Sequence, residues 1–260
     1  MLAKMIWNNL PTGARAAASV ALLFSFAACT RPLPSVPAPS RAADAETPAE
    51  PAEPSTPPGV KHVPGRFDYY VLSLSWSPQH CATRGKQARS DDPQCGDGVA
   101  FGFVVHGLWP QYEKGYPESC LVAKAVDASL VKRLLRIIPS PRLIQHEWQK
   151  HGTCSGLSAE RYFTAAESLF AALRIPPRYQ KPTAPVQTTP AELRQELVTA
   201  NPGLLPDSLA IYCRGPMLRE VRICYSKDLK PQRCAATVHD GCPRAGITVL
   251  PTQAAVTASP

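Results

Sequence analysis

Nine cysteines are the feature that most constrains how this 260-residue chain can fold. Setting Cys29 aside, eight remain, and nowhere in the chain are two cysteines separated by just two residues. The lack of such C-x-x-C pairs argues against a zinc site or a dithiol redox site. An even set of eight instead predicts four disulfide bonds, formed in an oxidising compartment. The set is Cys81, Cys95, Cys120, Cys154, Cys213, Cys224, Cys234 and Cys242.

Residues 1–28 are typical of an export signal. Lys4 and Arg15 supply positive charge, and an almost wholly apolar stretch follows up to Ala28. This stretch is shorter than the roughly 18 residues that a membrane-spanning helix needs. Small residues directly before Cys29 resemble the lipobox of bacterial lipoproteins, although Phe26 stands where leucine is usual. We therefore treat Cys29 as a lipidation candidate; the alternative is ordinary cleavage nearby.

The next segment, 29–65, has the composition of a tether. Ten prolines fall between Pro32 and Pro64 among alanine, serine and glutamate, so the segment cannot bury a core and favours extended states. The formal charge of the whole chain is +8, and residues 66–260 carry 23 basic against 16 acidic side chains. The positive charge thus belongs to the folded part, which favours a polyanionic partner. We expect the domain to span 66–250 and a flexible tail to span 251–260.

Apolar periodicity within the folded part mixes the two kinds of secondary structure. Strands and helices do not alternate strictly, so we expect an α+β fold: a single domain with a central, antiparallel-leaning sheet flanked by helices. Thr189-Pro190 with Glu192 forms a capping-box pattern, and Ser158 is a further N-cap candidate. Expected strands are 67–76, 101–105, 209–212 and 218–225; expected helices are 123–138, 142–152, 158–173 and 189–200.

The stretch HEWQKHGTC (146–154) concentrates ionisable groups. On a helix of about 100° per residue, its two histidines, one glutamate and one lysine share one face of about 140°, and Trp148 points away. Packing does not require such a face; the alternative is a solvated polar surface anchored by the tryptophan. These four residues are His146, Glu147, Lys150 and His151.

A metalloprotease needs H-E-x-x-H, with histidines four residues apart. Here His146 and His151 are five apart, so the imidazoles diverge by about 140° on a regular helix and do not readily share one ion. Glu147 and His151 are i,i+4 neighbours, which suits a carboxylate that supports an imidazole. We therefore expect acid–base chemistry and no metal.

His106 is the candidate for a second catalytic histidine. It follows the apolar strand 101–105 and precedes Gly107, which allows close backbone approach, and we expect Trp109-Pro110 to turn the chain. Two histidines can divide the roles of acid and base near neutral pH. Taken alone, a histidine at a strand end is more often structural.

Together, FVVHGLWPQY (103–112) and HEWQKHGTC (146–154) resemble the two active-site segments of the ribonuclease T2 family. The resemblance runs from about Phe67 to Val249, and it excludes the signal and the tether. It implies a secreted, metal-independent endoribonuclease without a cofactor. The implied reaction is attack of a ribose 2′-hydroxyl on the adjacent phosphorus, which gives a 2′,3′-cyclic phosphate and then a 3′-phosphate.

The resemblance also implies roles for single residues. His106 and His151 would be the acid–base pair, Glu147 would support them, and Lys150 and His146 would stabilise charge on the phosphate. We assign His106 as the proton donor and His151 as the acceptor, although the sequence leaves the two roles exchangeable. Glu147 would favour an imidazolium at His151.

Base recognition is expected around Trp109, whose indole face accepts any base; a core tryptophan is the alternative. Gln111, Tyr112 and Tyr116 follow it and are candidates to contact the base edge. Some family members carry aspartate at the position of Gln111, so we expect broad base specificity. The resemblance further implies a disulfide map: Cys81–Cys95, Cys120–Cys154, and a nested pair with Cys213–Cys242 outside and Cys224–Cys234 inside.

The leading hypothesis is therefore an exported endoribonuclease, periplasmic or held at a membrane by a lipid on Cys29. We expect RNA as substrate, no obligate protein partner and a monomer. The runner-up is a non-catalytic, cysteine-stapled lipoprotein that binds RNA or another polyanion. A metallopeptidase is a third reading, which the five-residue histidine spacing weakens.

Overall fold

The computed structural model describes residues 62–84, 92–96 and 100–252, and every structural statement below concerns these residues. The expected signal, the candidate Cys29 and nearly all of the expected tether lie outside them. Of the expected tail, Thr252 is still buried and donates its backbone N–H to Pro182 O at 2.9 Å. No helix within the described ranges combines the length and apolarity needed to cross a bilayer.

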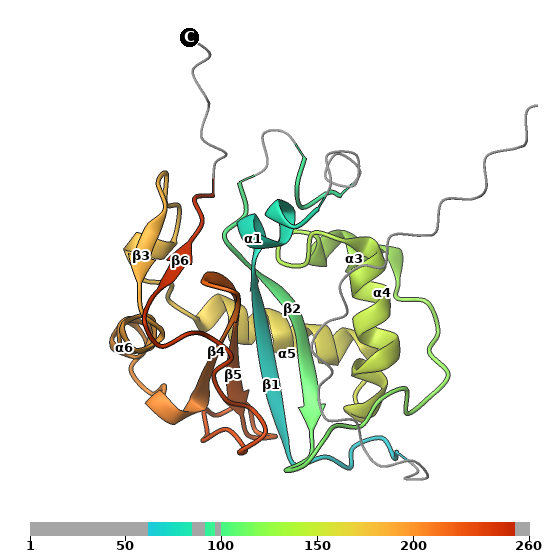
Figure 1. Ribbon diagram of the computed structural model, residues 1–260. Coiled ribbons are helices and arrows are strands. Elements are labelled where there is room, and N and C mark those ends of the chain that lie inside the picture. Colours follow the sequence, from blue (N-terminus) through green and yellow to red (C-terminus); the bar gives the residue numbers. More distant parts are fainter. Residues whose placement is uncertain (1–61, 85–91, 97–99, 253–260) are drawn as a thin grey trace, which may run out of the picture. The chain divides into compact units, whose positions relative to one another are not determined.

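A six-stranded mixed sheet forms the centre of one α+β domain, as expected (Figure 1). The strand order is β2-β1-β5-β6-β3, and β4 pairs with β5 off this path. Every pairing is antiparallel except the short parallel contact between β5 and β6. The strands are β1 (Tyr69–Trp76), β2 (Phe103–Gln111), β3 (Val186–Thr188), β4 (Leu209–Arg214), β5 (Met217–Tyr225) and β6 (Ile247–Val249).

Helices flank the sheet, and α4 and α5 both contact β2 (Figure 1). Two side-chain caps start helices as the sequence predicts: Ser158 caps α5, and Thr189 with Glu192 forms the capping box of α6. Ser140 caps α4 in the same way. The α-helices are α1 (Ser77–Ala82), α3 (Ala128–Leu134), α4 (Pro141–Lys150), α5 (Ala159–Ala172) and α6 (Pro190–Ala200). Short 3₁₀ turns are η1 (Gly152–Cys154), η2 (Pro177–Tyr179) and η3 (Pro206–Ser208).

The helix expected over 123–138 is much shorter. Asp127 accepts a hydrogen bond from the backbone N–H of Ser129 at 2.8 Å and so starts α3 late. Before it, the N–H of Val126 donates to the Gln145 side chain at 2.8 Å instead of to a helical carbonyl. The apolar positions of the pattern are nevertheless buried, because extended and helical segments here cover the same core.

Strand β2 is longer than expected. The chain does not turn at Trp109-Pro110: both residues stay paired with β1, in the registers Val71↔Trp109 and Tyr70↔Pro110. Proline is tolerated there because β2 lies at the edge of the sheet, where one side of the strand needs no ladder hydrogen bond.

Four disulfides close the loops of the domain in the implied map. They are Cys81–Cys95, Cys120–Cys154, Cys213–Cys242 and Cys224–Cys234. Cys120–Cys154 joins the segment between the two motifs to the turn that follows α4.

The two faces of the sheet bury different clusters. A large core lies on the face that carries Leu72 and Leu74 of β1. A smaller cluster on the opposite face holds Val71, Trp109 and Cys224. The candidate site is built at this second face.

Candidate active site

A β-bulge in β2 positions His106. The register jumps from Leu74↔Val105 to Ser73↔Gly107, so His106 has no Cα partner on β1. A bulge inserts one extra residue and changes which side chains share a face. Val105 and Leu108 both enter the large core. In a regular strand, two side chains three positions apart would point to opposite faces of the sheet.

The same bulge brings His106 and Trp109 together. Their rings meet edge to face, with centroids 5.2 Å apart, although their spacing of three would separate them in a regular strand. Between them, Gly107 has no room for a side chain: a Cβ there would overlap the Glu147 carboxylate and the Trp109 indole nitrogen. The expected close approach at Gly107 is therefore present, and the group that approaches is a side chain from α4.

Helix α4 supplies Glu147 to the site. Its carboxylate is buried, accepts the Trp109 indole N–H at 2.8 Å, and lies 3.9 Å from His106 Nε2. Trp148 points the other way and packs against Tyr162, with ring centroids 5.9 Å apart. The division of α4 into a chemical face and a packing face thus follows the helical geometry expected from the sequence.

A second carboxylate, which the sequence analysis missed, faces the other nitrogen of His106. Glu220 on β5 is 1% exposed, and its Oε2 lies 3.2 Å from His106 Nδ1. Its other oxygen, Oε1, accepts a hydrogen bond from Arg222 Nε. Although burial favours the neutral carboxyl, Arg222 and His106 hold the pKa of Glu220 far below its ordinary value.

Arg222 is itself held between aromatic rings. Its guanidinium carbon lies 4.8 Å from the Trp109 ring centroid and 4.2 Å from that of Tyr212. Glu220 and Arg222 are two residues apart on a strand and therefore share a face. Opposite charges at that spacing, inside the apolar strand expected at 218–225, were the available signal of a buried ion pair, but nothing in the sequence named His106 as its partner.

His151 follows the last residue of α4 and is 4% exposed. Its ring lies 5.5 Å from that of Trp109 and 5.9 Å from that of Tyr116, centroid to centroid. Its Nδ1 is buried and has no hydrogen-bond partner among the described residues. The Trp109 indole thus contacts both candidate catalytic imidazoles.

The expectation that Glu147 stabilises an imidazolium at His151 is wrong. Burial, followed by the positive charges of Lys150, His106, His146 and Arg222, puts the pKa of His151 well below its ordinary value. The carboxylate of Glu147 is turned toward Trp109 and His106 instead. His151 is therefore neutral at neutral pH.

The two remaining polar residues of the motif, Lys150 and His146, are more accessible to solvent than Glu147 and His151. Lys150 is half-buried, with its ammonium 5.5 Å from the Tyr116 ring centroid, and His146 is exposed on α4. Both act electrostatically on His151 and contribute to its lowered pKa.

The residues expected to bind a base are only partly accessible. Trp109 is 4% exposed and Gln111 6% exposed, whereas Tyr112 and Tyr116 are half-buried. The burial of Trp109 supports the alternative reading, a core tryptophan, and its indole N–H is engaged by Glu147. The Gln111 amide nitrogen is buried without a partner among the described residues, and the Tyr112 hydroxyl lies 3.4 Å from His62 Nδ1.

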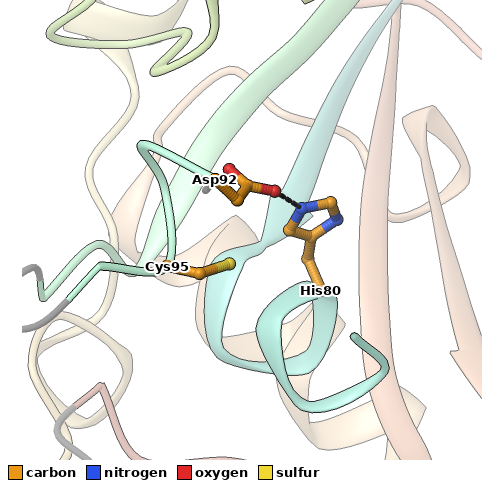
Figure 2. Close-up of side chains that lie close together, drawn as sticks. All are labelled: His80, Asp92 and Cys95. Atoms are coloured by element: carbon orange, nitrogen blue, oxygen red, sulfur yellow. Dashed lines mark hydrogen bonds and ion pairs between the residues drawn. The ribbon is translucent and has the colours of Figure 1, made fainter. Parts of the chain in front are cut away.

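Outside this site, His80, Asp92 and Cys95 come close together, as ligands of a metal would (Figure 2). They do not suit a metal: Cys95 is bonded to Cys81, and Asp92 already binds His80 at 2.8 Å and Arg84 at 3.3 Å. The cluster is instead a set of hydrogen-bonded side chains beside a disulfide.

A half-buried His106 beside two carboxylates, a buried His151 and four disulfides define a class of disulfide-bonded α+β proteins whose site holds the groups that acid–base catalysis requires. The chain belongs to the Ribonuclease T2 family, whose model matches residues 67–234. A protein named "Ribonuclease" from Aeromonas hydrophila is 40% identical over 172 residues, which is 63% of this chain and 74% of that protein. A "Probable ribonuclease" from Haemophilus influenzae is 40% identical over 120 residues, covering 42% of this chain and 44% of that protein.

Solved structures share the fold. The RNase-related protein from Calystegia sepium superimposes with a TM-score of 0.57 at 24% identity, over 71% of this chain and 97% of that one. RNase NT, solved in complex with 5′-AMP, gives a TM-score of 0.55 at 24% identity over 71% of this chain and 98% of that one. At this identity the match concerns the fold, and the chemistry is argued from the site itself.

Proposed function

We propose that this protein is a metal-independent endoribonuclease that cleaves single-stranded RNA through a 2′,3′-cyclic phosphate. The observation that carries the proposal is the contrast between two imidazoles that both contact the Trp109 indole. His106 contacts two carboxylates, whereas His151 contacts none and is surrounded by positive charge. Family membership and the relatives named ribonucleases support the same activity and disfavour a purely RNA-binding lipoprotein.

This contrast supports an assignment of the roles in proton transfer. His151 is neutral, so it accepts the proton of the ribose 2′-hydroxyl; because Nδ1 is the buried nitrogen, we assign Nε2 to the substrate. His106, between Glu147 and Glu220, is stabilised as an imidazolium and donates a proton to the leaving 5′-oxygen. In the second step the same groups exchange roles, and water opens the cyclic phosphate.

In this proposal, Lys150 and His146 stabilise the reacting phosphate. Lys150 and His146 lie close enough to His151 to lower its pKa, which supports a role for both beside the proposed proton acceptor. We propose that Lys150 offers a fixed positive charge to the phosphorane oxygens, where charge grows in the transition state. His146, which is exposed, binds the phosphate from the solvent side.

For the base, we propose a shallow subsite at Tyr112 and Tyr116, with the Gln111 amide beneath it. Stacking on tyrosine rings accepts every base, so the expected specificity is broad. Cleavage of defined oligonucleotides that differ in one base on the 5′ side of the scissile phosphate measures it. A strict preference for one base would contradict this assignment.

Four disulfides support export, because such bonds persist in oxidising compartments. We propose that residues 1–28 direct export and that a lipid on Cys29 holds the protein at a membrane through its tether. Fractionation of cells expressing the full chain tests this: the wild type should sediment with membranes, and Cys29→Ala should be soluble. A wild type that is already soluble would contradict the lipid anchor but not the ribonuclease.

Product analysis tests the activity itself. A defined RNA is incubated with the purified protein in EDTA, and the products are analysed by mass spectrometry. We expect 2′,3′-cyclic phosphate ends followed by 3′-phosphate ends, and no cleavage after a 2′-deoxy nucleotide, because the nucleophile is then absent. Efficient cutting at the deoxy position, or loss of all activity in EDTA, would overturn the proposal.

A further inference from the structure

Glu220 stands where it can control the orientation of His106. The carboxylate is almost wholly buried, and the 3.2 Å separation from His106 Nδ1 is a hydrogen-bond distance. Because Glu220 is ionised, it can only accept, so the proton of this hydrogen bond belongs to Nδ1 of the imidazole. In the neutral form of the ring, Nε2 is then the bare nitrogen, and in the charged form it carries the transferable proton.

Arg222 holds Glu220 in this position. Its Nε donates to Glu220 Oε1, which leaves Oε2 for His106, and its guanidinium is fixed between the Trp109 and Tyr212 rings. A bare buried carboxylate would otherwise be costly. The arrangement is a chain of contacts from Tyr212 through Arg222 and Glu220 to His106.

The balance of charges along these contacts bears on the protonation of His106. Glu147 and Glu220 face His106 with two negative charges, and Arg222 supplies one positive charge. A protonated His106 completes the balance of these four groups. Of the remaining charged or titratable neighbours, Lys150 and His146 on α4 act on the neutral His151, whose ring lies 5.5 Å from that of Trp109.

We propose that Glu220, held by Arg222, is a positioning residue that orients His106 and keeps it competent as the general acid. This inference rests on the proposed ribonuclease function and adds to it a residue pair from a distant strand. Neither Glu220 nor Arg222 touches the reacting atoms; both act through His106. An equally buried ion pair with a purely structural role would affect stability and leave the proton-donating step unchanged.

The test compares two substrates that differ in how much they need an acid. A dinucleoside monophosphate has a poor alkoxide leaving group, whereas a nucleoside 3′-(4-nitrophenyl phosphate) releases nitrophenolate without protonation. Glu220→Gln should slow the first reaction at least about tenfold, a part of the roughly 10²–10⁴-fold of general acid catalysis, and should leave the second nearly unchanged. The descending, alkaline limb of its pH–rate profile should also move to lower pH.

Controls separate this role from folding and from the function itself. Glu196→Gln removes the charge of another arginine-paired glutamate, bound to Arg178 at 2.8 Å, and should leave both rates unchanged. If Glu220→Gln does not fold, the double variant Glu220→Gln/Arg222→Gln removes both buried charges and should show the same substrate split.

Two outcomes would overturn the inference. Equal losses on the two substrates would mean that Glu220 acts on structure alone, and an unshifted alkaline limb would mean that it does not act on His106. Both presuppose a wild type that forms the cyclic phosphate. A wild type that does not form it would instead refute the proposed function, so the two failures are distinguishable.

Discussion

The two histidines of the site are chemically the same side chain in opposite surroundings. His106 lies among carboxylates on a sheet, and His151 lies among cations and apolar rings at the end of a helix. Burial acts on His151 in the same direction as its charged neighbours, since both disfavour the imidazolium. In the proposed mechanism the environment, not the residue type, therefore determines which of the two is the base.

Removal of either imidazole should abolish most turnover and leave the fold intact. His106→Ala and His151→Ala should each lose roughly 10²–10⁴-fold in kcat, because each removes one proton-transfer group. The double variant should be little worse than either single variant, since the two act as one unit. Turnover is measured alongside melting temperature, with His239→Ala, an exposed histidine, as the control. Near-normal turnover in His106→Ala would refute its role.

Lys150 should affect both the rate and its pH dependence. Its charge is the largest cause, after burial, that lowers the pKa of His151. Lys150→Ala should therefore reduce kcat more than it raises KM and should move the ascending, acidic limb of the pH–rate profile to higher pH. Lys150→Arg keeps the charge and should restore the position of the limb. An acidic limb that stays in place in Lys150→Ala would show that the lysine does not act on His151.

At the scale of elements, the contacts of β2 with α4 depend on a residue without a side chain. A methyl group on Gly107 would overlap the Glu147 carboxylate and the Trp109 nitrogen. Gly107→Ala should thus displace Glu147 and lower kcat strongly with a small change in melting temperature. Gly152→Ala is the matched comparison, because its methyl group would overlap the packed rings of Trp148 and Tyr162, and it should mainly lower the melting temperature. Normal turnover in Gly107→Ala would show that Glu147 is not fixed by this contact.

The sequence predicted these elements well where local chemistry decides them. Caps at Ser158 and Thr189 started helices as expected, because a side-chain oxygen satisfies backbone donors within the same turn. The bulge at His106 was missed, because it depends on the register with β1, a distant segment. The three-residue strands β3 and β6 were missed as well, since so short a segment carries no periodicity.

The candidate site was predictable to the extent that its residues lie in two recognisable motifs. His106 and the four polar residues of α4 and its C-terminal turn stand in two short segments, and the resemblance supplied the pairing of those segments. Glu220 and Arg222 lie 70 and 72 residues beyond the end of α4, on a strand that reaches His106 only through the sheet order β2-β1-β5. Burial also favours the neutral form of His151, where the sequence led us to expect an imidazolium, and burial is set by the tertiary structure.

For the whole molecule, buried ionisable groups predict a particular loss of stability in acid. The unfolded chain protonates histidine near 6.5, but folded His151 resists protonation, so stability falls as the pH drops below about 6.5. Glu220 has a folded pKa below its ordinary 4.5, so its contribution is present above that value and is lost as the pH falls further.

Melting temperatures measured from about pH 3 to pH 8 test this two-stage loss. His151→Ala should flatten the curve in the upper part of the acidic range, and Glu220→Gln should flatten it in the lower part, whatever each does to stability at neutral pH. Glu196→Gln, which lies outside the site, should follow the wild-type curve. Wild-type curves that coincide with both site variants after a constant offset would contradict the assignment.

The bulge in β2 has a consequence for how this enzyme can change over evolution. His106 and Trp109 share a face because the strand contains one residue more than its partner. Point substitutions preserve that count, so they vary the chemistry of the site while its layout persists. A deletion of one residue within 104–108 restores an unbroken ladder and sends either the histidine or the tryptophan to the opposite face. The architecture of the site is therefore robust to substitution and fragile to changes of length, and natural variation in this strand should consist of replacements.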